Sequence, residues 1–262
     1  MKTKKAENII FLIIILLAGI LYFSGMPFSL LSINVQNKNI PLENIFYIVN
    51  SFFMSIVVIM IVKTINKNWI FGLTLQLLIK NIFDNGKLFL LGTIVTTILS
   101  IYVYKPLNRI PTFGEIIFWV LLFNFSVPII EEILLRALLL NVFKNIFEKN
   151  IMLAIIMASA IFGIAHIPGM INENIFMIVI RVLGTTSVGI SLSLIYIKTK
   201  NLWTVIVLHF ILNSFGSIIY YFSNSNEVYE IAKLWPIPMI IVCIINLKTI
   251  KIVENKSRTN GI

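Results

Sequence analysis

The chain has 262 residues, of which 58% are hydrophobic and only 12% are charged. A soluble domain carries about twice that share of charged residues, so the composition excludes an ordinary water-soluble protein and indicates one that uses the lipid bilayer as its solvent. The formal net charge of +10 does not indicate nucleic acid, because the basic residues stand in short clusters between apolar runs and no RNA- or DNA-binding motif is present. The single cysteine, Cys243, excludes an internal disulfide.

Eight apolar runs along the chain have about the length that a transmembrane helix needs. They cover residues 8–25, 45–62, 88–104, 116–142, 151–166, 175–197, 202–221 and 232–247. The first follows three lysines, as a secretory signal would, but its apolar core is long and no A-x-A site follows it, so we expect an uncleaved span. The stretch 69–83 is apolar but short and contains Gln76 and Lys80. We expect it to form an interfacial helix on the inner side of the membrane.

The basic residues between these runs predict the orientation of the chain. With the N-terminus inside, the inner segments hold fifteen of the 21 Lys and Arg residues and the outer loops hold four. This bias is expected for a multi-pass protein of the cell membrane with both termini in the cytoplasm. Arg136 and Arg181 lie within spans; we expect Arg181 to snorkel from the outer end of its helix, with a catalytic role as the alternative. The sequence therefore predicts an all-α polytopic bundle of about eight transmembrane helices, with residues 1–262 forming a single membrane domain.

Three charged residues interrupt the fourth run, in the stretch PIIEEILLRALLL (residues 128–140). Each ionisable side chain at the centre of a transmembrane helix costs roughly 2.5 to 3.5 kcal/mol on insertion scales. Glu132 and Arg136 are four residues apart and can pair on one helix face. Glu131 is turned about 100° away and remains a free carboxyl, which suits a general base. Pro128 removes a backbone hydrogen bond one turn earlier, and a kink there could make room for water or substrate.

Both histidines of the chain fall within predicted spans. His166 ends the sequence FGIAH, and His209 opens the sequence HFILN, in which Asn213 follows on the same helix face. Either histidine alone would be as readily explained by a hydrogen bond between helices. Counting ~1.5 Å per residue from the inner end of each span puts Glu131, both histidines and Asn213 near the middle of the membrane. We therefore expect these side chains to meet at one site.

Other catalytic arrangements are poorly supported. No H-E-x-x-H sequence is present. Asp84 is the only aspartate, which excludes an aspartyl dyad, and Cys243 is far in sequence from both histidines. A serine mechanism stays open, because GIS (residues 189–191) is similar to the Gly-x-Ser of rhomboid-type proteases and His209 could act as its base. Leu192 replaces the usual following glycine, however, and small residues in spans are often helix-packing sites.

Three sequence patterns resemble the motifs of the CAAX protease and bacteriocin-processing (CPBP, or Abi) family of intramembrane proteases. EEILLR is similar to the family's E-E-x-x-x-R motif, FGIAH to its F-x-x-x-H motif and HFILN to its H-x-x-x-N motif. All three occur in the family's order between residues 115 and 215, which we expect to form a protease-like core. The first 110 residues carry no signature of the family beyond their hydrophobicity.

The resemblance implies a set of catalytic roles. Glu131 and His166 would activate a water that attacks the scissile carbonyl, and His209 and Asn213 would stabilise the oxyanion. These roles are physically compatible with the side chains, since a carboxylate accepts a proton and N–H groups suit a developing negative charge in a water-poor cavity.

The resemblance also raises the question of a metal, because the family is often labelled metalloprotease. Glu132 and Arg136 would position Glu131, and a zinc ion held by Glu131, His166 and His209 is chemically compatible with these residues. We favour the metal-free mechanism, since zinc ligation by Glu131 would leave Glu132 as the base although Glu132 is well placed to bind Arg136.

By this resemblance, the expected function is hydrolysis of a peptide bond in a membrane-associated protein or peptide. Eukaryotic relatives cut prenylated CAAX substrates, whereas bacterial relatives are linked to bacteriocin immunity and peptide maturation. One alternative is a non-proteolytic immunity or binding protein in which the same residues form a buried polar network. Another is a small proton-coupled transporter, although the chain has no internal repeat or paired broken helices of the transporter kind.

Overall fold

The computed structural model describes residues 2–23, 42–69, 71–102, 112–148, 150–167, 174–221 and 236–259. These residues form helices and no strand, so the predicted all-α fold is confirmed. Counting the run from α5 to α7 as one, the described residues form eight helices, as expected. They are α1 (Lys2–Phe23), α3 (Leu42–Ile65), α4 (Leu78–Tyr102), α5 (Phe113–Ile116), η1 (Ile117–Phe123), α6 (Asn124–Glu132), η2 (Ile133–Leu139), α7 (Leu140–Ile146), α8 (Ile151–Ile164), α9 (Ile175–Thr199), α10 (Leu202–Tyr221) and α12 (Pro236–Thr259).

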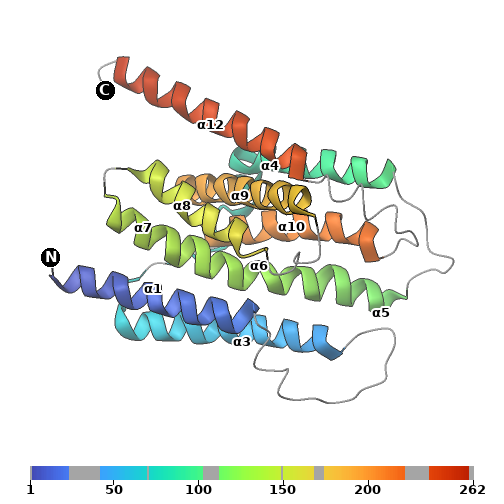
Figure 1. The fold of residues 1–262 in the computed structure, drawn as a ribbon, viewed down its shortest axis with the longest axis horizontal. Helices are drawn as coiled ribbons and strands as arrows, with labels where there is room; N and C mark the ends of the chain where they lie inside the picture. The colour runs from blue at the N-terminus through green and yellow to red at the C-terminus, as the bar shows by residue number, and fades with distance from the viewer. Residues whose placement is uncertain are drawn as a thin grey trace.

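One continuous helical run, Phe113–Ile146, extends along the bundle from α5 to α7 (Figure 1). It begins with a capping box, in which the Thr112 hydroxyl accepts a bond from the Glu115 N–H and the Glu115 carboxylate accepts one from the Thr112 N–H. Two of its segments, η1 and η2, are π-helical. Such widened turns are rare and often occur at functional sites, and here they lie on either side of α6.

The other helices pack around this central run. Helices α3 and α10 both contact α6, α4 contacts α10, and the pair α8 and α9 packs together with α12 on the outer side of α9. In Figure 1, α1 and α3 lie side by side along one edge of the bundle and α12 lies at the opposite edge. Every residue from 128 to 140 is consequently buried.

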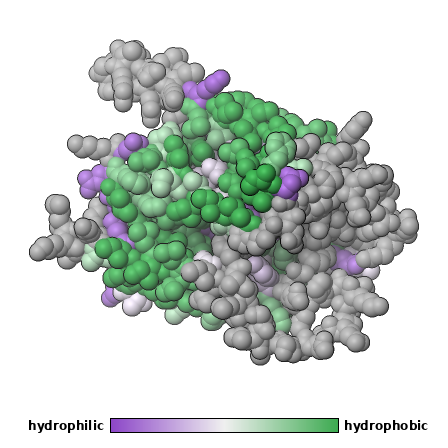
Figure 2. All heavy atoms as spheres, in the orientation of Figure 1, coloured by the Kyte–Doolittle hydropathy of each residue, from purple (hydrophilic) through white to green (hydrophobic). Residues whose placement is uncertain are grey.

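The outer surface of the bundle is apolar. Leu16, Phe53 and Ile175 are 63%, 62% and 75% exposed, and Figure 2 shows that hydrophobic residues cover most of the described part of one face. Within the described residues, four helical runs are long and apolar enough to cross a membrane by length and composition, and four shorter apolar helices accompany them. Exposure of this much apolar surface would be unfavourable in water, and the chain is a membrane protein.

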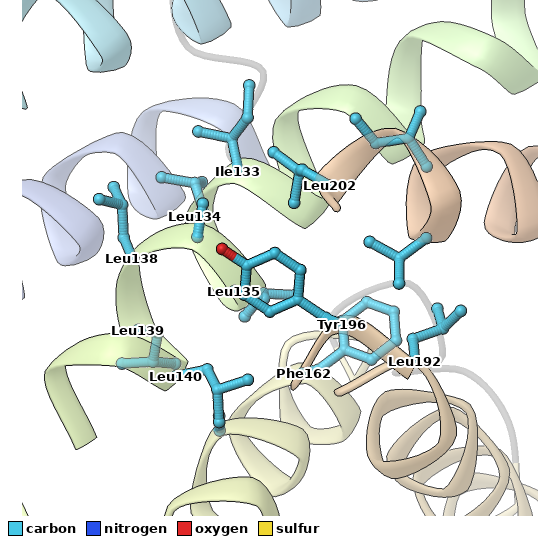
Figure 3. Close-up of a cluster of buried hydrophobic side chains, with 14 of the residues drawn as sticks. Ile133, Leu134, Leu135, Leu138, Leu139, Leu140, Phe162, Leu192, Tyr196 and Leu202 are labelled. Atoms are coloured by element: carbon cyan, nitrogen blue, oxygen red, sulfur yellow. The ribbon is translucent and has the colours of Figure 1, made fainter. Parts of the chain in front are cut away.

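The buried interior contains a cluster of aliphatic and aromatic side chains from several helices (Figure 3). Leu138 and Leu140 come from the central run, Leu192 and Tyr196 from α9, and Leu202 from α10. This cluster gives the interior a low dielectric constant, in which charge interactions are stronger than in water.

The predicted interfacial helix over residues 69–83 is wrong. Residues 71–75 are not helical, and the helix that starts at Leu78 continues as α4, ten residues before the predicted start of that span. Two residues in this segment adopt positive φ angles, Gly72 at 71° and Leu77 at 57°, and such angles interrupt a right-handed helix.

Tertiary hydrogen bonds hold this non-helical segment in place. The Asn201 amide donates to the carbonyl oxygens of Thr74 at 2.9 Å and Gln76 at 3.2 Å. Its oxygen accepts a bond from the Thr204 N–H at 3.2 Å, which caps the start of α10. One buried side chain therefore connects the 71–77 segment to the α9–α10 turn.

Other helices extend beyond the predicted spans, because hydropathy identifies the apolar part of a helix and not its ends. Helix α1 starts at Lys2 instead of residue 8, and α12 runs on to Thr259 instead of residue 247. Residues 232–235 of the last predicted span lie outside the described part of the chain. Helix α8 ends at Ile164, so His166 lies in the turn that follows it and not within the helix.

Replacing Asn201 tests whether it anchors the 71–77 segment. Asn201→Ala removes three hydrogen bonds and leaves buried backbone groups unpaired, so we expect it to lower the unfolding free energy by about 1 to 3 kcal/mol. Thermal unfolding in detergent micelles would measure this as a lower Tm. Asn68→Ala is the matched control, because the Asn68 side chain is exposed; equal Tm values for the two variants would contradict the anchoring role.

Candidate active site

Three charged side chains lie buried where α6 meets η2. Glu131 and Glu132 are the last residues of α6, and Arg136 lies within η2. Their exposed fractions are 5%, 0% and 1%. Charges removed from water in this way are tolerated when they are paired and hydrogen-bonded, so the partners of each one determine what the site can do.

Arg136 binds Glu132 on its own helix. Its Nη1 lies 2.9 Å from the Glu132 Oε1, the i,i+4 ion pair that the sequence predicts. Its Nη2 donates a long bond of 3.5 Å to the Gly189 carbonyl on α9, and its Cζ lies 4.9 Å from the centroid of the Phe162 ring on α8. The guanidinium therefore connects three elements of the fold.

Helices α8 and α9 pack closely at Gly189, the residue whose carbonyl accepts the bond from Arg136. A Cβ atom at Gly189 would lie 2.9 Å from the Cβ and 3.1 Å from the Cα of Ser159. A Cβ at Gly163 would lie 2.8 Å from the Val182 carbonyl oxygen. Both glycines therefore let the two helix backbones approach closely, as small residues do between membrane helices.

His209, on α10, reaches both glutamates. Its Nδ1 lies 2.8 Å from the Glu132 Oε1, and its Nε2 lies 3.8 Å from the Glu131 Oε2. The ionised carboxylate that binds Arg136 can only accept hydrogen bonds, so we assign the proton to Nδ1. The neutral ring then presents a lone pair at Nε2, whereas the imidazolium presents an N–H at that atom.

His166 is oriented by the backbone of α8. Its Nδ1 lies 2.8 Å from the Phe162 carbonyl oxygen. A carbonyl only accepts, so Nδ1 is again assigned the proton and the neutral ring has a lone pair at Nε2. The Phe162 ring also lies beside both imidazoles, with centroid separations of 4.7 Å to His166 and 5.9 Å to His209. The two histidines thus meet around one aromatic ring.

The remaining sequence candidates have fewer contacts. Asn213 lies one turn after His209 on α10, is half-buried and makes no side-chain hydrogen bond within the described residues. Ser191 is fully buried, and in the described part of the chain no hydrogen bond joins it to His209. Because both His209 nitrogens face the glutamates instead, the alternative serine mechanism lacks its base.

Two further residues, Arg181 and Tyr47, interact electrostatically with Glu131. A catalytic role for Arg181 is the alternative that the sequence leaves open, whereas Tyr47 is not among the sequence candidates. Arg181 of α9 is half-buried, and its charge attracts Glu131 and also acts on His166. Tyr47 of α3 interacts electrostatically with Glu131. The position of a charged residue within a predicted span could have identified Arg181 from the sequence, whereas no sequence feature distinguished Tyr47.

The side chains as arranged do not fit a metal site. Among the described residues, no group of three or more His, Cys, Asp or Glu side chains converges on a point where it could hold an ion. The Glu132 Oε1 is bound by Arg136 and by His209. Glu132 is therefore poorly suited to replace Glu131 as the base, as zinc held by Glu131, His166 and His209 would require.

Comparison with known proteins points to a protease family. Residues 113–215 match the family model described as type II CAAX prenyl endopeptidase Rce1-like. The match contains all three motifs and nearly coincides with the stretch 115–215, so the family resemblance of that stretch is confirmed. Searches of curated proteins and of solved structures gave no match.

Replacing Gly189 tests the packing that supports Arg136. Gly189→Ala should push α8 away from α9 and lower the Tm in micelles, because the added methyl meets the Cβ and Cα of Ser159; overpacking of this kind typically costs about 1 to 3 kcal/mol. Gly19→Ala in α1 is the matched control, since a Cβ there meets nothing within 4 Å. Adding Ser159→Gly to Gly189→Ala should restore part of the Tm, and a Gly189→Ala protein as stable as the control would contradict the assignment.

Proposed function

We propose that this membrane protein is an endopeptidase that hydrolyses a peptide bond of a membrane-associated protein or peptide, using a water activated by Glu131 and His166. The family match over residues 113–215 supports protease activity. The observation that carries the mechanism is the difference between the two adjacent glutamates. Glu132 is fully buried and bound on one oxygen by two partners, whereas Glu131 keeps a small accessible surface of 5%.

Glu131 is proposed as the general base. Its Oε2 is 3.8 Å from the nearest His209 nitrogen, which is longer than a hydrogen bond. The carboxylate therefore keeps acceptor capacity for a water, and its position beside a buried ion pair limits how it can move. As the water oxygen attacks the scissile carbonyl carbon, Glu131 takes one proton from that water and later delivers it to the leaving amine nitrogen.

His166 is proposed to orient the same water. Its Nδ1 bond to the Phe162 carbonyl leaves Nε2 with a lone pair in the neutral ring. A lone pair accepts a hydrogen bond from water and fixes the direction of the attacking oxygen. The role needs no change in the charge of His166 during the first step.

His209 and Asn213 are proposed to stabilise the oxyanion. The Glu132 carboxylate accepts the His209 Nδ1–H, and donation from Nε2 to a negative oxygen requires the imidazolium form of the ring, which carries an N–H on both nitrogens. The Asn213 amide follows one turn later on the same helix and supplies a second donor. Donors fixed in a water-poor site stabilise developing charge without having to reorganise during the reaction.

Replacing Glu131 tests the role of the general base. Glu131→Gln keeps the shape of the side chain but cannot take a proton, so we expect cleavage to fall by about 10²- to 10⁴-fold. Initial rates should be measured on tagged membrane peptides, including a prenylated CAAX peptide because the matched family is named for that substrate.

Ser191→Ala at matched expression is the control and should cleave at the wild-type rate. Full cleavage by Glu131→Gln would overturn the mechanism. If the wild type cleaves no peptide while Glu131→Gln lowers its Tm, the residues would instead be a structural network of a non-proteolytic protein.

Metal removal tests the metal-free form of the mechanism. Incubation with 1,10-phenanthroline should leave the cleavage rate unchanged, because the proposed base and the oxyanion donors belong to the protein. A zinc-dependent peptidase treated in parallel confirms that the chelator works in the same micelles. Loss of cleavage that returns on addition of zinc would contradict this form and favour Glu131, His166 and His209 as ligands.

A further inference from the structure

We propose that Phe162 is a positioning residue, whose ring fixes Arg136, His166 and His209 relative to one another. The inference deepens the proposed function, and its kinetic test rests on that function. It assigns to the aromatic side chain a role distinct from filling space in the core.

Three functional side chains from three elements meet the Phe162 ring. The Arg136 Cζ, from η2, lies 4.9 Å from the ring centroid. The His166 ring, from the turn after α8, lies 4.7 Å away at an interplanar angle of 89°. The His209 ring, from α10, lies 5.9 Å away at 83°. Both imidazoles are thus almost perpendicular to one benzene ring that also faces a guanidinium.

The charge distribution of benzene explains why these neighbours suit one another. The ring face is negative and attracts a cation, and the positive edge favours perpendicular contacts with other aromatic rings. Phe162 is only 2% exposed, so water screens these attractions weakly. An aliphatic side chain of similar volume could fill the space but would offer neither the negative face nor the directional edge.

The backbone of the same residue reinforces the arrangement. The Phe162 carbonyl binds the His166 Nδ1 at 2.8 Å, so ring and backbone act on one histidine. The next residue, Gly163, brings α8 against the Val182 backbone of α9. Figure 3 draws Phe162 in the buried cluster that includes Leu192 and Tyr196. The ring therefore has a fixed position from which to orient the charged and polar groups.

A fluorinated series separates the electrostatic role of the ring from its shape. Phenylalanine at position 162 would be replaced by its 4-fluoro, 3,5-difluoro and 3,4,5-trifluoro derivatives, which weaken the negative face at nearly constant size. We expect kcat to fall stepwise with fluorine number while KM stays constant. Phe162→Leu should lower kcat by about 10- to 100-fold, the scale seen when catalytic groups are misplaced.

The matched controls are the same replacements at Phe89. This phenylalanine of α4 is also fully buried but has no ring contact with Arg136 or either histidine within the described residues. The controls should keep the wild-type kcat. A series at position 162 that keeps kcat at the level of the Phe89 variants would overturn the proposal.

A spectroscopic readout needs no substrate. The chain has only two histidines, so ¹⁵N-histidine labelling of the full protein, purified without a histidine tag, reports on His166 and His209 alone. The wild type should give separate signals for protonated Nδ1 and unprotonated Nε2 of His166. Phe162→Leu should broaden or average the imidazole signals, and the trifluoro variant should shift them, while the Phe89 controls should do neither.

The two readouts separate the failure of each proposal. If the wild type cleaves no peptide but the imidazole signals respond to changes at position 162, the positioning role stands and the protease function fails. If the wild type is active but the imidazole signals match those of the Phe89 controls, the positioning role is overturned, even where kcat falls.

Discussion

The neutralisation of buried charge is the constraint on which the rest of this structure depends. Glu132 and Arg136 have almost no contact with solvent, and each is tolerated there because the other is 2.9 Å away. Removing one partner of such a pair typically costs roughly 3 to 5 kcal/mol, because the other charge is left unpaired. The contacts of Arg136 with Gly189 and Phe162, and of Glu132 with His209, then fix α8, α9 and α10 around the central run.

This pairing gives the adjacent residues Glu131 and Glu132 different hydrogen-bond partners, although their side chains are chemically identical. One oxygen of Glu132 is bound by a guanidinium and an imidazole, whereas Glu131 faces the second nitrogen of the same imidazole from beyond hydrogen-bonding distance. The Glu132 carboxylate is therefore occupied by contacts within the protein, whereas the Glu131 carboxylate can still accept a hydrogen bond from a water. The proposed division between base and support follows from their partners and not from the residues themselves.

The apolar surroundings give these few polar contacts their strength. Glu131, Glu132, Arg136 and His209 are buried in a bundle whose interior contains the leucine-rich cluster of Figure 3. Electrostatic interactions are strongest where water is scarce, which is also why an aromatic face can contribute to holding Arg136. Small residues between α8 and α9 complete the arrangement by allowing the backbones to approach.

The sequence by itself determined the all-α membrane fold, the positions of the apolar runs and the pairing of Glu132 with Arg136. These depend on composition and on helical periodicity, which act between residues close in the chain. Tertiary structure alone decided that His209 lies between the two glutamates, that the Phe162 ring contacts Arg136 and both histidines, and that Arg181 and Tyr47 interact electrostatically with Glu131. It also decided the non-helical path of residues 71–77, which depends on Asn201. Such contacts join segments far apart in sequence, and no local pattern encodes the distance between them.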